Sequence, residues 1–314
     1  MEDRQETAEP LQDVKGARRA ASLCAFTTVA EITIAYTLIF VASVLIRNVG
    51  IGERMYDNLL MLVNTVAVDL IAMPLCWLLL LRRVPKAAAP ETGSRTRLSF
   101  SKLLFYLPCA FCLMYAGGLA GKLIGKLFDN GLSDVIGETM SGVDLWVEVL
   151  CTVIIGPAAE ELFFRKAMID RLSGYHPLDA ILLSALLFAL MHGNIAQFLY
   201  ALPLGVLFGI IYYRTRNIGY TILLHTVLNV FGGLVPQLLY GSDNRISLLA
   251  VAAFGLFILA MCITGVILLI VYRRRFLPIA SDRPRCRKPF FLNAGFIVAC
   301  AVFAALFVLN EIIA

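Results

Sequence analysis

Apolar segments alternate with short polar segments along almost the whole chain. Most of them reach about 18 residues, the length that a helix needs to cross a hydrocarbon core of about 30 Å. The pattern predicts nine membrane-spanning helices, at residues 22–46, 59–81, 103–123, 145–164, 178–192, 195–213, 218–240, 246–272 and 290–313. The fifth and sixth lie so close together that one of them could be re-entrant, which gives eight or nine spans.

The composition is that of a protein that lies in lipid. Hydrophobic residues make up 60% of the 314 residues and charged residues 16%, whereas an ordinary soluble domain has about 25% charged residues. The segments between the spans are too short for a separate soluble domain. We therefore expect an all-α polytopic membrane protein, with a polar cytoplasmic tail at residues 1–21 and a single transmembrane domain at residues 22–314.

The distribution of Lys and Arg indicates the orientation. If the N-terminal tail is cytoplasmic, the inside segments are 1–21, 82–102, 165–177, 214–217 and 273–289, and they hold 22 of the 27 Lys and Arg residues. Cytoplasmic loops of membrane proteins carry such an excess. We expect a multi-pass protein with a cytoplasmic N-terminus, in the plasma membrane if the source is bacterial. The net charge of +5 comes from these loops and does not indicate a nucleic-acid partner.

Ionisable and amide side chains within or at the ends of three predicted spans mark a candidate site. A charged group in a membrane helix costs a few kcal/mol, so each is a hypothesis of function. The six side chains are Glu160, Glu161, Arg165, His192, His225 and Asn229. Other polar residues in the predicted spans, Glu31, Asp69 and Glu148 among them, are interpreted as contacts between helices.

The spacing of these residues predicts which side chains share a helix face. Residues four apart on a helix point the same way, so Glu161 can pair with Arg165, and His225 projects together with Asn229. Glu160 is turned by about 100° from Glu161. One glutamate is therefore neutralised by the arginine, and the other is available for a different neighbour.

Such a set of side chains can activate water. A carboxylate in a low-dielectric environment is a stronger base, and a histidine beside it can share the proton transfer. A second histidine and an amide could donate hydrogen bonds to the oxyanion of a tetrahedral intermediate, each contributing about 3–4 kcal/mol. No G-x-S-x-G elbow accompanies these residues, so the chain shows no preferred serine nucleophile. Amide hydrolysis of this kind needs no organic cofactor.

Three short motifs resemble those of a known family. EELFFR begins at Glu160, FALMH ends at His192 and HTVLN begins at His225, which fit EExxxR, FxxxH and HxxxN in that order. The chain is similar to the CPBP family of intramembrane proteases, also called Abi, which includes the Rce-type CAAX prenyl endopeptidases and bacteriocin-processing proteins. The resemblance covers residues 145–235 and implies a catalytic core there, with the active site inside the helical bundle.

The resemblance implies a role for each motif residue. Glu160 would be the principal catalytic glutamate, and His192 its partner in activating water. His225 and Asn229 would form the oxyanion pocket. The second glutamate and the arginine of the first motif, Glu161 and Arg165, would support them. The implied function is an endopeptidase that cleaves a membrane-associated peptide or protein in the lipid bilayer.

Three questions stay open at this stage. A non-catalytic membrane scaffold or a bacteriocin-immunity protein could have the same fold, because an intramembrane Glu–Arg pair can be a topology anchor and a membrane histidine a packing residue. Family names suggest a metalloprotease with a divalent metal such as zinc, but HExxH is absent and the same side chains could activate water without a metal. Depth is the third question, because His192 is expected roughly 21 Å from the start of its span, deeper than Glu160 and His225. Either that helix starts outside the bilayer or its predicted boundaries are wrong.

Overall fold

The described structure consists of helices. In the computed structural model, residues 8–84, 98–127, 142–240, 245–276, 285 and 287–313 are described, and every regular element within these ranges is helical. The all-α polytopic fold predicted from the sequence is confirmed.

The segments that lie on the predicted spans are helices, several of them interrupted by wider π-helical turns. The helices are α1 (Ala8–Arg47), α2 (Glu53–Thr65), η1 (Val66–Ala72), α3 (Met73–Leu79), η2 (Leu81–Arg83), α4 (Phe100–Leu127), α6 (Leu145–Glu148), η3 (Val149–Ile155), α7 (Gly156–Glu160), η4 (Glu161–Ile169), α8 (Asp170–Leu172), α9 (Pro177–Met191), α10 (Ile195–Thr215), α11 (Ile218–Asn229), η5 (Val230–Leu234), α12 (Val235–Tyr240), α13 (Arg245–Val271), α14 (Arg273–Phe276), α15 (Arg287–Phe291) and α16 (Ala294–Ile313). Elements α6 to α8 follow one another without a break and form one long rod, residues 145–172.

Among the described residues, six helices are long and apolar enough to cross a membrane, judged by length and composition. They lie at Val14–Arg47, Glu53–Arg83, Ser101–Ile124, Ile195–Thr215, Ile218–Leu239 and Leu248–Val271. Two shorter apolar helices, Pro177–Met191 and Ala294–Leu309, cover the remaining predicted spans apart from the rod 145–172, which carries the charged motif. The protein is therefore an integral membrane protein of several passes.

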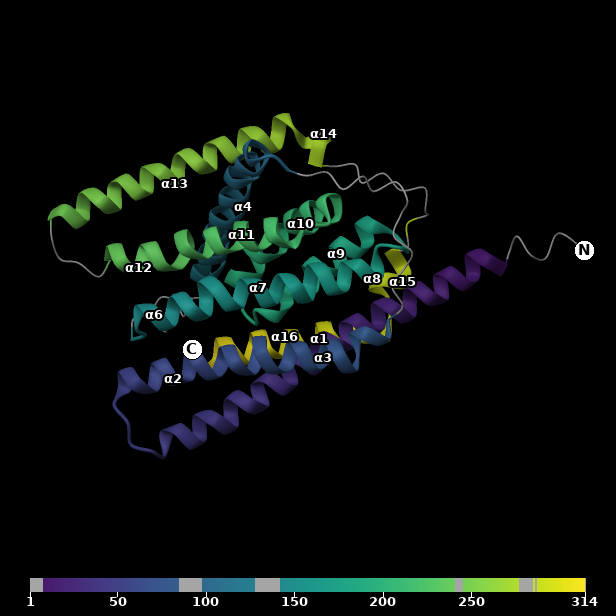
Figure 1. Ribbon diagram of the computed structural model, residues 1–314, viewed down its shortest axis with the longest axis horizontal. Coiled ribbons are helices and arrows are strands. Elements are labelled where there is room, and N and C mark those ends of the chain that lie inside the picture. Colours follow the sequence, from purple (N-terminus) through teal and green to yellow (C-terminus); the bar gives the residue numbers. More distant parts are fainter. Residues whose placement is uncertain are drawn as a thin grey trace, which may run out of the picture.

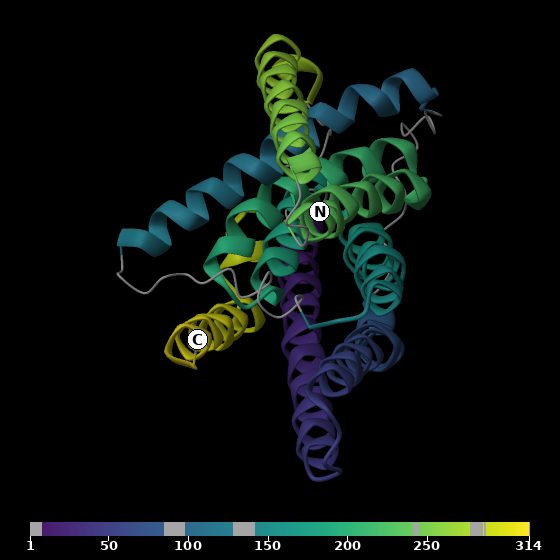
Figure 2. The same cartoon turned by 90° about the vertical axis from the view of Figure 1, so that its left-hand side faces the viewer.

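The helices that carry the motifs lie in the middle of the bundle. Helix α10 packs against both α9 and α4, and α13 packs on the far side of α4. On the opposite flank α1 packs against η1 and α16. Figures 1 and 2 show α13 and the pair α1 and α2 at the two edges, with α7, α9 and α11 between them, and α4 steeply inclined to α13.

Two apolar cores hold this arrangement together. One joins α1, α3, η4, α9 and α16 and includes Cys24, Phe164 and Phe303. The other joins α4, α10, α11 and α13 around Phe111 and Phe208. Glycines allow α4 to approach α10 closely: a Cβ at Gly121 would stand 2.7 Å from the Ala196 Cα atom.

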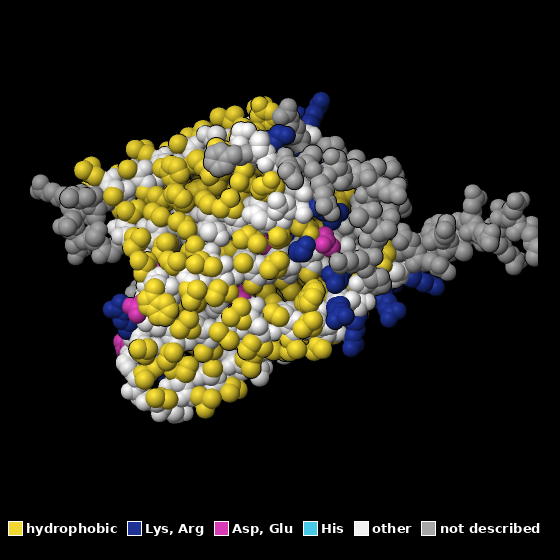
Figure 3. Space-filling model, viewed as in Figure 1, with side chains coloured by type: hydrophobic (Ala, Val, Ile, Leu, Met, Phe, Trp, Pro, Cys, Tyr) yellow, Lys and Arg dark blue, Asp and Glu magenta, His cyan; other side chains and the backbone are white. Residues whose placement is uncertain are grey.

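The first helix begins inside the segment expected to be a polar tail. Helix α1 starts at Ala8, and Ala17 and Ala20 are buried against the first apolar core. Its partners are elements near the C-terminal part of the chain, since α1 packs against α15 and α16. Figure 3 shows apolar side chains over the flank of the molecule, with Lys and Arg gathered at the end where the N-terminus lies.

Candidate active site

The first motif forms a buried ion pair on the rod 145–172. The Arg165 Nε atom lies 3.3 Å from Glu161 Oε2, and both side chains are fully buried. The pair that the four-residue spacing predicts is therefore present. Glu160 ends α7 and Glu161 starts the wider turn η4. Such π-helical turns are rare and are often found at functional sites.

His225 lies between the two glutamates of the first motif. Its Nδ1 atom is 3.1 Å from Glu161 Oε1, and its Nε2 atom is 3.7 Å from Glu160 Oε2. Since a carboxylate accepts hydrogen bonds, Nδ1 carries the hydrogen in this contact and Nε2 faces Glu160. The resemblance pairs Glu160 with His192 in activating water, and the contact that the described structure gives Glu160 is with His225.

His192 is held by the backbone of its own helix. It caps the C-terminus of α9, and its Nδ1 atom lies 2.9 Å from the carbonyl oxygen of Phe188. A carbonyl only accepts, so Nδ1 donates and the neutral ring keeps a lone pair on Nε2. The chain then turns through Gly193, whose φ of 70° suits glycine, into Asn194, whose side chain caps α10. This turn fixes the place of His192 between α9 and α10.

Phe188 packs against three side chains of the motifs. Its ring centroid lies 4.8 Å from that of His192 and 6.0 Å from that of His225. The Arg165 guanidinium carbon stands 4.0 Å from the same ring centroid, in a cation–π contact. Spacing along the chain assigns Phe188 no role, although it is the first letter of FxxxH. The ring centroid of Phe208 in α10 lies 5.8 Å from the same guanidinium carbon, and Phe208 is part of no motif.

Asn229 faces a different neighbour from the one that the resemblance implies. Its Nδ2 atom donates to the carbonyl oxygen of Thr152 at 2.7 Å, and the Thr226 hydroxyl donates to the next carbonyl, that of Val153, at 3.0 Å. Both acceptors lie in η3, and a change from α- to π-helical bonding frees carbonyls to accept from side chains. Asn229 thus fastens α11 to the rod 145–172.

The packing of the helices brings His192 level with the other motif residues. At 1.5 Å per residue, Glu160 is about 18 Å from the end of α8 and His192 about 22 Å from the start of α9. His225 is only about 10 Å from the start of α11. Figure 1 shows the α8–α9 turn extending farther than the α10–α11 turn toward the end where the N-terminus lies. The extra length of the α8–α9 hairpin accounts for the difference in depth.

Glu and His side chains are also the donors of many metal sites. No group of three or more His, Cys, Asp or Glu side chains within the described ranges is placed to hold a metal ion. His225 uses Nδ1 on Glu161 and His192 uses Nδ1 on a backbone carbonyl. These bonds leave Nε2 of each ring free, which is also how metal-binding histidines are held, and the chemistry below is derived from the side chains alone.

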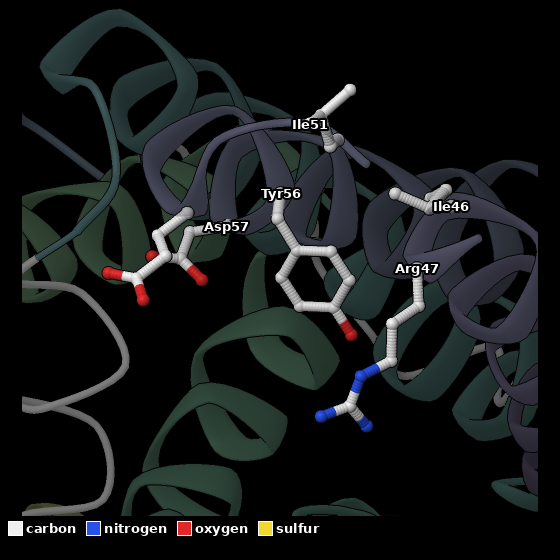
Figure 4. Close-up of a pocket in the computed structure, with 6 residues that line it drawn as sticks. Ile46, Arg47, Ile51, Tyr56 and Asp57 are labelled. Carbon is white, nitrogen blue, oxygen red and sulfur yellow. The ribbon is translucent and has the colours of Figure 1, made fainter. Parts of the chain in front are cut away.

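A surface cavity of about 400 Å³ lies elsewhere. Its walls are Ile46, Arg47, Ile51, Glu53, Tyr56 and Asp57, at the junction of α1 and α2. In Figure 4 the Tyr56 ring lies between Arg47 and Asp57. The cavity contains no motif residue. It is a surface hollow between half-buried and exposed side chains, whereas the motif residues are largely buried in the bundle.

The geometry combines a base, an oriented histidine and a fixed counter-charge. Glu160 keeps 19% of its side chain exposed, so it can reach a substrate or a water, whereas Glu161 is fully enclosed. Glu161 holds His225 through Nδ1 and is itself balanced by Arg165. Such a relay fixes the orientation of the far nitrogen of the imidazole. The site has the parts that water-mediated hydrolysis requires.

Comparison with known proteins agrees with the motifs. Residues 142–231 match the family model for "Type II CAAX prenyl endopeptidase Rce1-like". "Putative membrane peptidase YdiL" of Bacillus subtilis (strain 168) is 29% identical over 163 residues, which cover 49% of this chain and 64% of that protein. "UPF0177 protein YxdF" of Lactococcus lactis subsp. lactis (strain IL1403) is 32% identical over 118 residues, 35% of this chain and 60% of that protein.

A third relative and the solved structures complete the comparison. "UPF0177 protein YbdJ" of the same Lactococcus strain is 34% identical over 99 residues, 30% of this chain and 41% of that protein. The chain thus spans less than two thirds of the length of each of these relatives. No solved structure matches it significantly. The family resemblance that the three motifs indicate is confirmed, and the family model matches the segment that carries the motifs.

Proposed function

We propose that the protein, whose residues 142–231 match the family model for type II CAAX prenyl endopeptidase Rce1-like proteins, is an intramembrane endopeptidase whose reaction centre is Glu160 with His225 and His192. The observation that carries the proposal is the position of His225, 3.1 Å from Glu161 and 3.7 Å from Glu160. One imidazole is thereby oriented by a buried carboxylate and directed at an accessible one. If Glu161 and Arg165 formed only a structural ion pair, no histidine would be required beside them.

The charges suggest how the groups share the work. Glu161 and Arg165 neutralise each other, so a protonated His225 is balanced by an ionised Glu160. Glu160 then takes a proton from a water molecule, and the oxygen of that water attacks the carbonyl carbon of the substrate peptide bond. The Nε2–H group of His225 donates to the developing oxyanion. Glu160 passes the proton to the leaving nitrogen as the C–N bond breaks.

His192 fits the role of holding the attacking water. Its Nδ1 atom is engaged with the Phe188 carbonyl, so the free lone pair is on Nε2. That nitrogen can accept a hydrogen bond from the water that Glu160 deprotonates. The Phe188 ring, which lies against both histidines, keeps the two imidazoles apart and shields the Arg165 charge from them.

The substrate class follows from the position of the site. The motif residues are surrounded by apolar helices, so a substrate must be membrane-associated, such as a lipid-anchored peptide or the membrane segment of a protein. The basic end of the molecule (Figure 3) is the cytoplasmic end in this proposal, which places the N-terminus inside, and in a bacterium the membrane would be the plasma membrane. Cleavage of prenylated CAAX proteins is the activity in the family name, and it belongs here to the proposal only.

A non-catalytic scaffold or immunity protein is the second candidate, and one observation favours it. Asn229 donates to Thr152 as a structural residue does, although the resemblance places it in an oxyanion pocket. A scaffold would tolerate Glu160→Gln and His192→Ala without loss of function.

The test is a survey of peptide termini in membranes from cells that express wild type or Glu160→Gln at equal levels. Glu148→Gln is the matched control, because Glu148 is a buried carboxyl on the same rod and has no role in the mechanism. New termini present with wild type and Glu148→Gln, and missing with Glu160→Gln, support the peptidase and identify its substrate. Identical termini in all three overturn it in favour of the scaffold.

A further inference from the structure

Two buried carboxyl groups from the N-terminal helices lie behind Glu160, and the mechanism above does not use them. Glu31 in α1 is fully buried, and Asp69 in η1 is 7% exposed. Both carboxyl oxygens of Glu31 and the Oδ1 atom of Asp69 have no hydrogen-bond partner in the described structure. Buried polar groups are almost always paired, so contacts between helices do not explain these two.

The packing places these carboxyls next to the reaction centre. The turn η1 packs against α1 on one side and against α7 on the other. The Asp69 Oδ2 atom lies 4.0 Å from the position that a Cβ atom would take at Gly156, one helical turn before Glu160. Glu31 interacts electrostatically with Asp69, and both interact with Glu160. Three carboxyls, from α1, η1 and α7, therefore lie in one region of the bundle.

The surrounding charges separate Glu160 from the other two. Within the described ranges, the ion pairs of arginine join Arg54 to Asp144, Arg165 to Glu161, Arg216 to Asp170 and Arg285 to Asp179, and those of histidine involve Asp179, Glu160 and Glu161. None of them includes Glu31 or Asp69. The other titratable groups that face the pair are uncharged thiols, Cys76 of α3 beside Glu31 and Cys151 of η3 beside Asp69.

Burial without a counter-charge favours the neutral acid. An ionised carboxylate in an apolar interior is far costlier than a protonated one unless it is paired. Glu160 has His225 at 3.7 Å and keeps 19% of its side chain exposed, so it is the carboxyl of the three whose charge has a partner and access to water. Within the described structure, Glu31 and Asp69 form no ion pair with a basic side chain.

We propose that Glu31 and Asp69 are positioning residues that remain protonated while Glu160 is ionised, and that the site works only while this pair is neutral. A neutral pair leaves Glu160 free to act as the base. When the pair ionises at alkaline pH, it adds negative charge beside the oxyanion that forms during hydrolysis, and cleavage slows. The effect on cleavage rests on the proposed peptidase function, whereas the protonation of the pair does not.

Infrared spectroscopy of the full-length protein in liposomes tests the protonation directly. A protonated carboxyl has a C=O stretching band that is lost on ionisation. We expect Glu31→Gln and Asp69→Asn each to remove one such band from the spectrum at neutral pH. In Glu160→Gln the two bands should disappear at a lower pH than in wild type, because an ionised Glu160 no longer opposes ionisation of the pair. The control Glu148→Gln should not shift them.

Cleavage supplies the second measurement. With a substrate found by the terminus survey, Glu31→Gln and Asp69→Asn should remain active at neutral pH, because Gln and Asn resemble the neutral acids. Their alkaline limit of activity should move to higher pH by about one unit, a shift that a purely structural role would not produce.

The outcomes separate this inference from the proposed function. If neither Glu31→Gln nor Asp69→Asn removes a band at neutral pH, or if Glu160→Gln does not shift the bands, the inference is overturned, even where Glu160→Gln abolishes cleavage. If the bands behave as expected and Glu160→Gln leaves the peptide termini unchanged, the peptidase function fails and the neutral carboxyl pair stands. If the bands behave as expected and the alkaline limit stays where it is in wild type, the role in catalysis is overturned.

Discussion

The Nδ1 atom of His225 lies 3.1 Å from the Oε1 atom of Glu161, across 64 positions of the sequence. The same glutamate faces Arg165 through its other oxygen. His225 is therefore attached to a fixed, neutralised carboxylate, and its second nitrogen is directed at Glu160. This contact joins α11 to the rod 145–172 and connects two of the three motifs.

Replacement of Glu161 by Gln tests how much stability this pair provides. It leaves the Arg165 charge buried without a counter-charge, which costs about 3–5 kcal/mol. We expect a clear fall in the thermal unfolding temperature in detergent, larger than that of Glu160→Gln, whose side chain is partly exposed. The double variant Glu161→Gln with Arg165→Met should regain most of the stability and stay inactive, because His225 is no longer oriented. If the Glu161→Gln protein is as stable as wild type, the Glu161–Arg165 ion pair does not contribute to stability.

Replacement of Asn229 by Ala distinguishes two roles for this residue. The resemblance implies that it donates to the oxyanion, whereas the structure shows that it donates to the Thr152 carbonyl. Loss of the bond to the Thr152 carbonyl should cost about 1 kcal/mol of unfolding free energy. Thr226→Val, which removes the neighbouring bond to the Val153 carbonyl, is the matched variant and should cost a similar amount. An oxyanion donor would behave differently, because its loss lowers kcat by about 100-fold or more. We expect Asn229→Ala and Thr226→Val to lower cleavage equally and modestly.

Close packing of α4 on α10 depends on glycine. A Cβ at Gly117 would lie 2.6 Å from the Tyr200 Cα atom, and one at Gly121 would lie 2.7 Å from the Ala196 Cα atom. Overpacking of this kind costs about 1–3 kcal/mol. Gly118, with nothing within 4 Å of its Cβ position, is the control. We expect Gly121→Ala to lower the unfolding temperature and Gly118→Ala to leave it unchanged or raise it. Equal behaviour of the two variants would contradict this packing.

Asp144 gives the stability a dependence on acid pH. Its carboxyl accepts hydrogen bonds from Asn58 Nδ2 at 2.7 Å and from Arg54, which hold its pKa below the usual value. A depressed pKa means that the folded state binds the proton less well than the unfolded chain. The stabilisation is thus complete above the unfolded pKa of about 3.9 and is lost as the pH falls through the folded value.

The measurement is thermal unfolding of wild type and Asp144→Asn between neutral and acid pH. We expect wild type to be the more stable at neutral pH and the difference to shrink below about pH 4. Asp57→Asn serves as the control, because Asp57 is a neighbouring carboxyl for which no such bonds are described. A difference that stays constant down to acid pH would contradict the role of the Asp144 contacts.

The sequence by itself determined the spans and the contacts made within one helix. Residues 59–81 and 246–272, for example, could be predicted as helices because a bilayer leaves an apolar stretch of that length no other way to satisfy its backbone hydrogen bonds. The Glu161–Arg165 pair could be predicted because residues four apart share a face whatever surrounds the helix. The three motifs also sufficed to indicate the family whose model residues 142–231 match.

Only the tertiary structure decided which neighbours face each motif residue across helices. That His225 stands beside both glutamates, that Asn229 is engaged with Thr152, and that Glu31 and Asp69 lie behind Glu160 depend on the rotation, tilt and depth of separate helices. Each π-helical turn adds about one residue and so rotates the next part of the helix by about 100°. Turns η1, η3 and η4 therefore set the direction of Asp69, Glu160 and Arg165 relative to their neighbours, and spacing along the chain does not reveal such turns.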